Sequence, residues 1–443
     1  MNLVFGIILL VMYVVMMSIM IIFERDKPKN IILWSLLFIF TQVVGYVVYL
    51  LSRKTYYDKR NSLLVKQHED EVYTSLVEHK LNVQSIKMGD ELLEHNALAF
   101  NSLTTENNQF EIFDAYDKFK ANLIKELKSA THYILMELSH VNSIDFNEVA
   151  QILMEKASDG LMVKYVYDRP ISHTLRRNLK SAGVRVHRFS KHNVIGKIYG
   201  NLRNLIVIDG RLAYIANMNI SKDQLKDQNE VASAIMKIKG DMVQNINLSL
   251  HQDVIFASGK YIEYNDYKKE SISSDSVMQY VSNKIESNIE LLLIKAICMA
   301  KKSIQMELRS FIPTESIMSL LHFAINSNID VRLMVPLKTD IGGRFYASRA
   351  YAKELALLGA NVYLYDGYIN FNAINIDNEY VLYGSYTLDR AHISTSLQNV
   401  CVIKDTKVIN HFNKMFDEGI NNSYRINDAK FMLLREKFFK NFV

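Results

Sequence analysis

Residues 123–138, LIKELKSATHYILMEL, decide the fold, because a close copy of this stretch occurs later in the chain. Residues 293–308 read LIKAICMAKKSIQMEL, and eight of the sixteen aligned positions are identical without a gap. In both copies a helical pattern gives way to a strand pattern that ends at Met-Glu-Leu. The chain therefore contains an internal duplication of a helix–strand unit.

The regions around both copies continue the same alternation of helices and strands. Before the first copy, apolar residues at spacings of three and four predict one helical face, formed by Ile112, Tyr116, Phe119, Leu123 and Leu127. After each copy, strands are predicted at residues 161–168 and 182–190 in the first half, and at 330–336 and 359–367 in the second. The last predicted strands, NLRNLIVID at 201–209 and NFNAINID at 370–377, carry unexpected asparagines. This order predicts an α/β fold with one mixed, helix-flanked sheet per half.

Composition places few limits on function. The 443 residues carry a net charge of +5, which fits either a site near anionic lipid or an ordinary protein surface. The two cysteines, Cys298 and Cys401, lie in apolar stretches and have neither disulfide nor metal-ligand spacing. We therefore expect a reducing compartment, no metal and no cofactor, and we find no sign of nucleic-acid binding.

The N-terminal region is predicted to be a membrane hairpin. Residues 3–23 and 31–51 contain no charged side chain, and each stretch is long enough to cross roughly 30 Å of hydrocarbon as a helix. The short loop ERDKPKN separates them, and basic residues follow the second stretch. The positive-inside rule then places the large C-terminal part in the cytoplasm. We predict four regions: a transmembrane hairpin at 1–54, a polar connector at 55–109, and two α/β halves at 110–268 and 269–443.

These features together resemble the bacterial cardiolipin synthase family, membrane-bound members of the phospholipase D superfamily. The similar stretches are the hairpin at 23–53, FIPTESI at 311–317, FYASRAYAKELALLGANVYLYDG at 345–367, and the motif regions LIVIDGRLAYIANMNI and VLYGSYTLDRA. The resemblance implies two phospholipase D-like α/β/α halves related by pseudo-two-fold symmetry. It also implies transfer of a phosphatidyl group between phosphatidylglycerol molecules, with a His-x-Lys-x4-Asp motif in each half.

This sequence departs from the family motif at the positions that would carry the chemistry. The family's two histidines attack phosphorus and protonate the leaving group, and its two lysines hold the phosphate oxygens. The aspartates and the Gly-Ser turn are kept here, but the histidine and lysine positions are not, and Gln398 takes a further acidic position. The motif positions are Leu202, Asn204, Asp209 and Asn219 in the first half, and Asn370, Asn372, Asp377 and Thr387 in the second.

Neither leucine nor a neutral amide can take up and return a proton, and asparagine brings no charge to a phosphate. We therefore expect a catalytically inactive, membrane-anchored protein that binds phospholipid, for example phosphatidylglycerol or cardiolipin, or that partners an active relative or another membrane protein. The alternative is an active cardiolipin synthase, phosphatidyltransferase or phospholipase D with a rearranged site that uses His187, His192 or His392, with Lys191 or Lys197 as the cation. A third possibility is a structural adaptor in which the crevice that holds the family's catalytic residues is filled.

Overall fold

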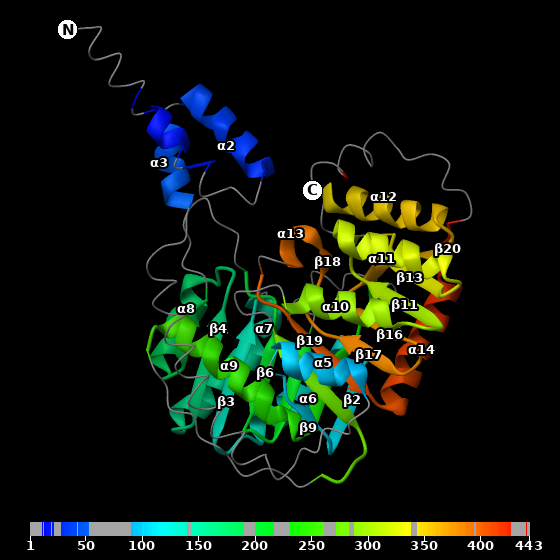
Figure 1. Cartoon of the computed structure of the whole chain (residues 1–443). Coiled ribbons are helices and arrows are strands. Elements are labelled where there is room, and N and C mark those ends of the chain that lie inside the picture. Colours follow the sequence, from blue (N-terminus) through cyan, green and yellow to red (C-terminus); the bar gives the residue numbers. More distant parts are fainter. Residues whose placement is uncertain are drawn as a thin grey trace, which may run out of the picture. The chain divides into compact units, whose positions relative to one another are not determined.

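The computed structural model describes residues 11, 13–18, 20–21, 28–41, 43–52, 90–100, 102–139, 141, 143–189, 200–216, 231–260, 272–282, 288–337, 343–393, 396–426 and 440. These residues form two compact units, a small one at the N-terminus and a large one that contains everything from residue 90 onward (Figure 1). The two units are described separately below.

The small unit holds the apolar helices α2 (Pro28–Thr41) and α3 (Val43–Ser52). The rings of Trp34 and Tyr49 lie 5.1 Å apart edge to face, so the second uncharged stretch forms two helices that fold back on each other. Buried Met20 and Phe38 pack with Tyr49 in the same cluster. Within the described part of the chain, no helix combines the length and the apolar character that crossing a membrane requires.

The first half of the large unit is a seven-stranded mixed sheet covered by helices. Its strand order is β2-β9-β7-β6-β3-β4-β5, with β3, β4 and β5 parallel to one another. Its elements are β2 (Asn108–Phe113), α6 (Tyr116–Lys128), β3 (Tyr133–Leu138), α7 (Ser143–Ser158), β4 (Met162–Tyr167), α8 (His173–Ser181), β5 (Arg185–Arg188), β6 (Leu205–Ile208), β7 (Leu212–Ala216), β8 (Val231–Ala232), β9 (Ile235–Gly240) and α9 (Met242–Ser258).

The second half repeats this order. Its sheet runs β1-β10-β19-β17-β16-β11-β13-β14-β20, which is the first sheet's order with one added strand at each edge. The elements are β10 (Val277–Ser282), α10 (Asn288–Met299), β11 (Ser303–Leu308), β12 (Phe311–Ile312), α11 (Glu315–Asn326), β13 (Asp330–Pro336), α12 (Gly343–Leu357), β14 (Asn361–Tyr365), β15 (Tyr368–Ile369), β16 (Asn372–Ile376), β17 (Tyr380–Tyr383), β18 (Leu388–Asp389), α13 (Arg390–Ile393), β19 (Asn399–Lys404), α14 (Thr406–Asn421) and β20 (Ser423–Arg425).

The structure therefore confirms the duplicated α/β architecture, and it corrects one boundary within it. Ile112 was predicted to share a helical face with Tyr116, but it lies in strand β2 opposite Met236. Ala115, with φ −129° and ψ 137°, is extended and forms the N-cap of α6, so the helix begins only at Tyr116.

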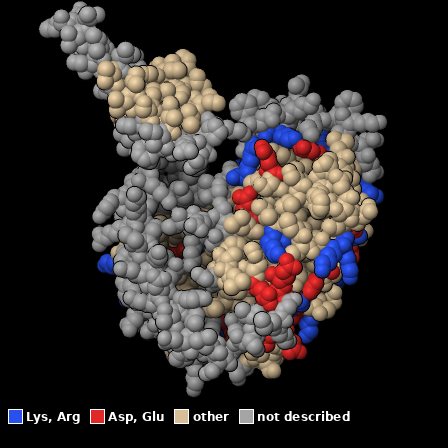
Figure 2. All heavy atoms as spheres, in the orientation of Figure 1, with Lys and Arg blue, Asp and Glu red and all other residues tan. Residues whose placement is uncertain are grey.

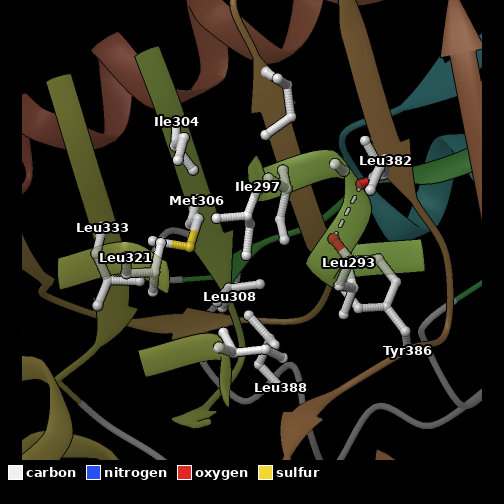
Figure 3. Close-up of a cluster of buried hydrophobic side chains, with 14 of the residues drawn as sticks. Leu293, Ile297, Ile304, Met306, Leu308, Leu321, Leu333, Leu382, Tyr386 and Leu388 are labelled. Atoms are coloured by element: carbon white, nitrogen blue, oxygen red, sulfur yellow. Dashed lines mark hydrogen bonds between the residues drawn. The ribbon is translucent and has the colours of Figure 1, made fainter. Parts of the chain in front are cut away.

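Each sheet buries one face under its own helices. In the second half, the repeat strand β11 contributes Ile304, Met306 and Leu308, which pack against Leu293 and Ile297 of α10 (Figure 3). The alternate residues of β11 face the other side of the sheet, as strand geometry requires. The buried Tyr386 hydroxyl donates to the Leu382 carbonyl at 3.0 Å, so this core closes without an unpaired phenol.

The end of the predicted polar connector belongs structurally to the second half. Helix α5 (Glu91–Phe100) buries Leu92 and Leu93 in the second-half core, and β1 (Thr104–Thr105) pairs with β10. The Tyr380 hydroxyl donates to Asp90 at 2.8 Å, and Lys404 forms an ion pair with the same carboxylate. The second-half sheet is therefore completed by residues that precede the first half.

The two halves share one continuous core between their sheets. Leu135, Val207 and Met236 of the first half lie in the same buried cluster as Phe371 and Tyr383 of the second. The Tyr383 hydroxyl donates across this junction to the Ala234 carbonyl at 2.8 Å and to Ile215 at 3.2 Å. Strands β6 and β16, which the motif positions flank or begin, therefore contribute to one shared core.

Candidate functional site

The two positions where the family has histidine occupy equivalent places at the junction of the halves. The Leu202 amide donates to the Leu397 carbonyl of the second half at 2.9 Å. The Asn370 amide donates to the Ala232 carbonyl of the first half, also at 2.9 Å. Each motif segment thus crosses into the opposite half and is held there by the backbone. Leu202 and Asn370 thus make comparable backbone contacts with the opposite half.

The retained aspartates hold the turn before each repeat strand. Asp209, with φ 54°, accepts hydrogen bonds from the amides of residues 131, 132 and 133 at 2.9, 2.7 and 2.9 Å. Asp377, with φ 56°, accepts from the amides of residues 301, 302 and 303 at 2.7, 2.7 and 2.8 Å. A carboxylate with three amide donors ties the motif strand to the start of the repeat strand. This use does not require a catalytic partner.

The two asparagines at the lysine positions are also used by the backbone. Asn204 Oδ1 accepts from the Ser139 amide at 2.7 Å, and Asn372 Oδ1 accepts from the Arg309 amide at 3.0 Å. Asn372 Nδ2 also donates to the Tyr386 carbonyl at 2.6 Å. An ammonium has three donors and no acceptor, so lysine cannot make the bond to either amide. The change from lysine to asparagine therefore replaces a phosphate clamp with a clamp on the repeat strand.

Asn204 also differs from the expected strand geometry. With φ 48°, its backbone is left-handed, a conformation that asparagine tolerates better than most residues. Leu202 and Asn204 consequently do not follow the simple alternation that predicted a shared pocket wall. Leu202 is half-buried.

Asn370 is a motif position whose side chain carries an unpaired hydrogen-bond donor among the described residues. Its side chain is 5% exposed, and among the described residues its Nδ2 has no hydrogen-bond partner. An unpaired buried donor typically costs about 1–3 kcal/mol unless something accepts its hydrogens. Asn370 thus provides a donor at the junction of the halves where the family has a histidine.

Thr387 and Gln398, which follow the second motif in the sequence, are hydrogen-bonded to each other. The Thr387 amide donates to Gln398 Oε1 at 3.1 Å, and Gln398 Nε2 donates to the Thr387 hydroxyl at 3.4 Å. Next to them, Ser385 and Asn399 exchange bonds at 2.9 and 3.0 Å. The Gln398 side chain can both accept from the Thr387 amide and donate to the Thr387 hydroxyl, whereas an ionised acidic side chain could only accept. Asn219, the trailing position of the first motif, lies outside the described residues.

A buried ionic cluster lies directly behind the first motif. Arg203, between Leu202 and Asn204, donates through one guanidinium nitrogen to both carboxylate oxygens of Asp253 on α9, at 2.7 and 2.6 Å. Both side chains are about 5% exposed or less. Asn399 of the second half donates to the Arg203 carbonyl at 3.3 Å. The cluster therefore joins the motif segment, α9 and the opposite half.

The acidic end of each repeat strand is buried as well. Burial raises the pKa of Glu137 well above its ordinary range, and the nearby Asp253 carboxylate raises it further, while Arg203 lowers it. Glu137 is 2% exposed, and neither of its carboxyl oxygens has a hydrogen-bond partner in the described structure. Burial alone raises the pKa of the equivalent Glu307 to about 8. Burial therefore favours the uncharged form of both glutamates, and Glu307 is mostly protonated at pH 7.

Of the three candidate substitute histidines, only His187 has a described side chain, and it lies away from the motif. His187 lies on β5, and the order β6-β3-β4-β5 separates it from the first motif strand by three strand spacings, about 14 Å. Burial lowers its pKa, and neighbouring cations lower it further. His192, Lys191 and Lys197 lie outside the described residues, as does the side chain of His392.

Other chemistry at the site is limited. Among the described residues, no group of three His, Cys, Asp or Glu side chains could hold a metal ion. Cys298 is exposed, and Cys401 is buried, which raises its thiol pKa. A cavity of about 540 Å³ lies elsewhere, between β2, the segment before β10 and the start of α14, and none of the motif positions lines it.

Two repeats of one mixed sheet, joined along their motif strands, define the phospholipase D type of fold. A phosphatidylserine synthase from Haemophilus influenzae shares this fold over 79% of this chain and 96% of its own, with a TM-score of 0.60 and 11% identity. Within that class, the chain belongs to the cardiolipin synthase family. The cardiolipin synthase of Alkalihalophilus pseudofirmus is 30% identical over 85% of this chain and 80% of that protein.

A second cardiolipin synthase, from Oceanobacillus iheyensis, is 27% identical over 92% of this chain and 90% of that protein. The family model described as "Cardiolipin synthase, PLD-like domain" matches residues 293–420. These similarities confirm the resemblance found in the sequence.

Sequence reasoning missed Arg203 and Asp253, which are 50 residues apart and carry no spacing signal. It also missed the interaction of both asparagine oxygens with the repeat strand. One feature of the sequence pointed to this interaction: both positions where the family has lysine hold asparagine, Asn204 and Asn372.

Proposed function

We propose that this protein is a membrane-anchored member of the cardiolipin synthase family that binds phospholipid but has lost phosphatidyl transfer. One observation carries the proposal. The side chains at the two lysine positions, Asn204 and Asn372, accept hydrogen bonds from the amides of Ser139 and Arg309. Both are uncharged, so neither can hold a phosphate as a cation. The two histidine positions hold Leu202 and Asn370.

Elementary chemistry supports the loss of activity. Attack on a phosphodiester needs a nucleophile with usable basicity near neutral pH, and a second group must protonate the leaving alkoxide. Neither leucine nor an amide does either task. Removing one donor aimed at developing charge typically costs about 3–4 kcal/mol, and here two cations are absent. Glu137 and Glu307 do not replace the two cations, since a carboxyl carries no positive charge in either protonation state.

The membrane part of the proposal rests on the sequence. We propose that the uncharged stretches 3–23 and 31–51 anchor the chain as two spans, with the large C-terminal part in the cytoplasm. A cysteine introduced at Ser62 should be modified by a membrane-permeant maleimide only, in intact cells of a C298S background. Equal labelling by an impermeant maleimide would contradict the cytoplasmic assignment.

The ligand part of the proposal rests on Asn370. Its buried Nδ2 offers a neutral donor at the junction of the halves, which suits a phosphate or glycerol oxygen of phosphatidylglycerol or cardiolipin. Asn370→Leu removes the donor at similar volume. Binding of the detergent-solubilised chain to phosphatidylglycerol should weaken in this variant, and Asn375→Leu in the following strand β16 serves as the matched control. Unchanged affinity in Asn370→Leu would favour an adaptor whose crevice is filled.

Turnover decides between binding and catalysis. The purified full chain is incubated in detergent with phosphatidylglycerol, and cardiolipin, phosphatidic acid and free glycerol are measured. We expect none of these products above a blank. An active relative with intact motifs, assayed in the same detergent, is the positive control. Product formed by the purified chain would overturn the proposal.

The alternative, an active enzyme with a rearranged site, is favoured by the names of the relatives, which are called cardiolipin synthases. In that case, turnover would be abolished by replacing one of His187, His192 or His392 with asparagine. Stimulation of an active relative by the purified chain, without turnover of its own, would instead support a partner role within the same proposal.

A further inference from the structure

One segment of the first half carries a strong and one-sided charge. Residues 169–188 contain six Lys or Arg and no Asp or Glu, although Asp168 immediately precedes them. The whole chain has a net charge of +5, so the other 423 residues sum to −1. The segment runs from the end of β4 through α8 to β5, the edge strand of the first sheet.

Helix α8 arranges these charges as a stripe. His173, Arg176, Arg177 and Lys180 follow the spacing i, i+3, i+4, i+7, which places them on one face of a helix. All four are exposed, whereas Leu175 and Leu179 on the opposite side are buried in the first-half core. The sequence of α8 thus separates a charged face from an apolar one.

The described part of the chain supplies no counter-charge to the stripe. Among the described residues, no carboxylate forms an ion pair with Arg176, Arg177 or Lys180. Arg176 and Lys180 are like charges four residues apart, a pairing that destabilises a helix by about 0.2–0.5 kcal/mol. On the face shown in Figure 2, by contrast, cations and carboxylates of the second half lie side by side, as in the pair Lys295–Glu91.

Neighbouring cations extend the stripe toward β5. The half-buried His187 is influenced by Lys180, Lys164, Arg185 and Lys260, all of which favour its neutral form. Lys164 is fully buried, and burial together with Arg185 lowers its pKa to about 8. Lys164 and Arg185 alternate with strand residues that pack under α8, so these cations lie on the opposite face of the sheet, and its β5 edge is basic on both faces.

The basic segment begins at the motif end of the sheet. The Arg169 amide donates to the Ser139 carbonyl at 2.9 Å, and the Ser139 amide is the group that Asn204 Oδ1 accepts from. Arg188 Nε reaches the Asp168 carbonyl at 3.4 Å in the same place. The cations thus extend from the vicinity of the first motif outward along α8.

We propose that the α8 stripe, formed by Arg176, Arg177 and Lys180, docks on the surface of an anionic phospholipid leaflet. Charge complementarity carries this choice, and the position of the stripe beside the motif of a lipid-enzyme fold supports it. The inference deepens the proposed lipid-binding function and rests on it for the identity of the surface. Each cation near an anionic leaflet strengthens surface binding roughly fivefold, so three contribute about a hundredfold.

The test uses the full chain in lipid nanodiscs. A fluorophore is attached at His173→Cys, which is exposed on the same face of α8 as the three cations, in a C298S background, and its accessibility to acrylamide, a neutral quencher, is measured. The discs contain phosphatidylcholine alone or mixed with phosphatidylglycerol. We expect several-fold weaker quenching in the phosphatidylglycerol discs, with the protection lost at high salt.

Charge-matched variants complete the test. R176Q/R177Q/K180Q should abolish the protection, whereas K125Q/K128Q/K301Q, with the same change in charge at exposed positions elsewhere, should retain it. Asn370→Leu should also retain it, so failure of the headgroup pocket and failure of the stripe give different results. Equal quenching in both kinds of disc, or protection by a soluble polyanion but not by phosphatidylglycerol, would overturn the proposal.

Discussion

Replacing Glu307 with glutamine should make the protein's stability less dependent on pH. Glu307 is 4% exposed at the end of β11, and burial raises its pKa from 4.5 to about 8. The folded chain at pH 7 must therefore hold a proton that the unfolded chain releases. Because the folded pKa is raised, the stability contribution of this carboxyl is intact below pH 4.5 and is lost as the pH rises toward 8.

The magnitude follows from the gap between pH 7 and the ordinary pKa. The 2.5 pH units from 4.5 to 7, at 1.36 kcal/mol each, correspond to about 3 kcal/mol of stability that wild type lacks at pH 7 relative to pH 4.5. Glu307→Gln has nearly the same shape and never ionises. Its stability relative to wild type should rise by about 3 kcal/mol between pH 4.5 and pH 7.

Thermal unfolding of the full chain in neutral detergent, followed by circular dichroism from pH 4.5 to 8, measures this difference. Glu106→Gln, at an exposed loop position, is the matched control and should give a flat difference. The glutamine amide in this apolar site can lower the thermal unfolding midpoint at every pH. The test is therefore how the midpoint difference between Glu307→Gln and wild type changes with pH. A midpoint difference for Glu307→Gln that stays constant from pH 4.5 to 8 would refute the reasoning.

Two further variants probe the motif region. Asp253→Asn should destabilise the folded chain by about 3–5 kcal/mol in chemical denaturation, because it leaves the Arg203 guanidinium buried without its carboxylate, and the double variant R203M/D253L should recover most of that loss. A double variant as unstable as the single one would contradict this view of the pair. Asn372→Leu should cost about 1–3 kcal/mol, because leucine leaves the Arg309 amide and the Tyr386 carbonyl unpaired, whereas Asn370→Leu removes a donor that has no partner among the described residues and should cost less; equal losses in the two variants would contradict the backbone role.

The fold could be predicted from the sequence because both copies of the duplicated unit show the same local helix and strand patterns. The copies at 123–138 and 293–308 form the equivalent pairs α6–β3 and α10–β11, and the strands predicted after them occupy equivalent places in two sheets of the same order. Ile112 was misplaced because three- and four-residue spacings cannot mark where an extended residue such as Ala115 interrupts a helical pattern. The contribution of residues 90–105 to the second-half sheet depends on long-range pairing with β10, which local patterns do not encode.

The site was predictable in position but not in detail. Motif spacing predicted that Leu202 and Asn370 are equivalent, and their amides make similar bonds to the opposite half. It did not predict that Asn204 would adopt φ 48° and turn its oxygen to Ser139, since alternation assumes extended backbone. The Arg203–Asp253 pair joins residues from a motif strand and a helix, and only the packed structure brings them together.

The pairing of β1 and β10 with the second sheet has a practical consequence for fragments of this chain. A piece limited to residues 293–420, the span that the family model matches, would lose β10 and leave β19 as an outer strand with unpaired amides. That strand reads NVCVIK, and its Val400, Cys401, Val402 and Ile403 are all buried in the intact chain. A bare apolar strand edge is a template for intermolecular pairing, so such a fragment should self-associate unless it is extended to include β10.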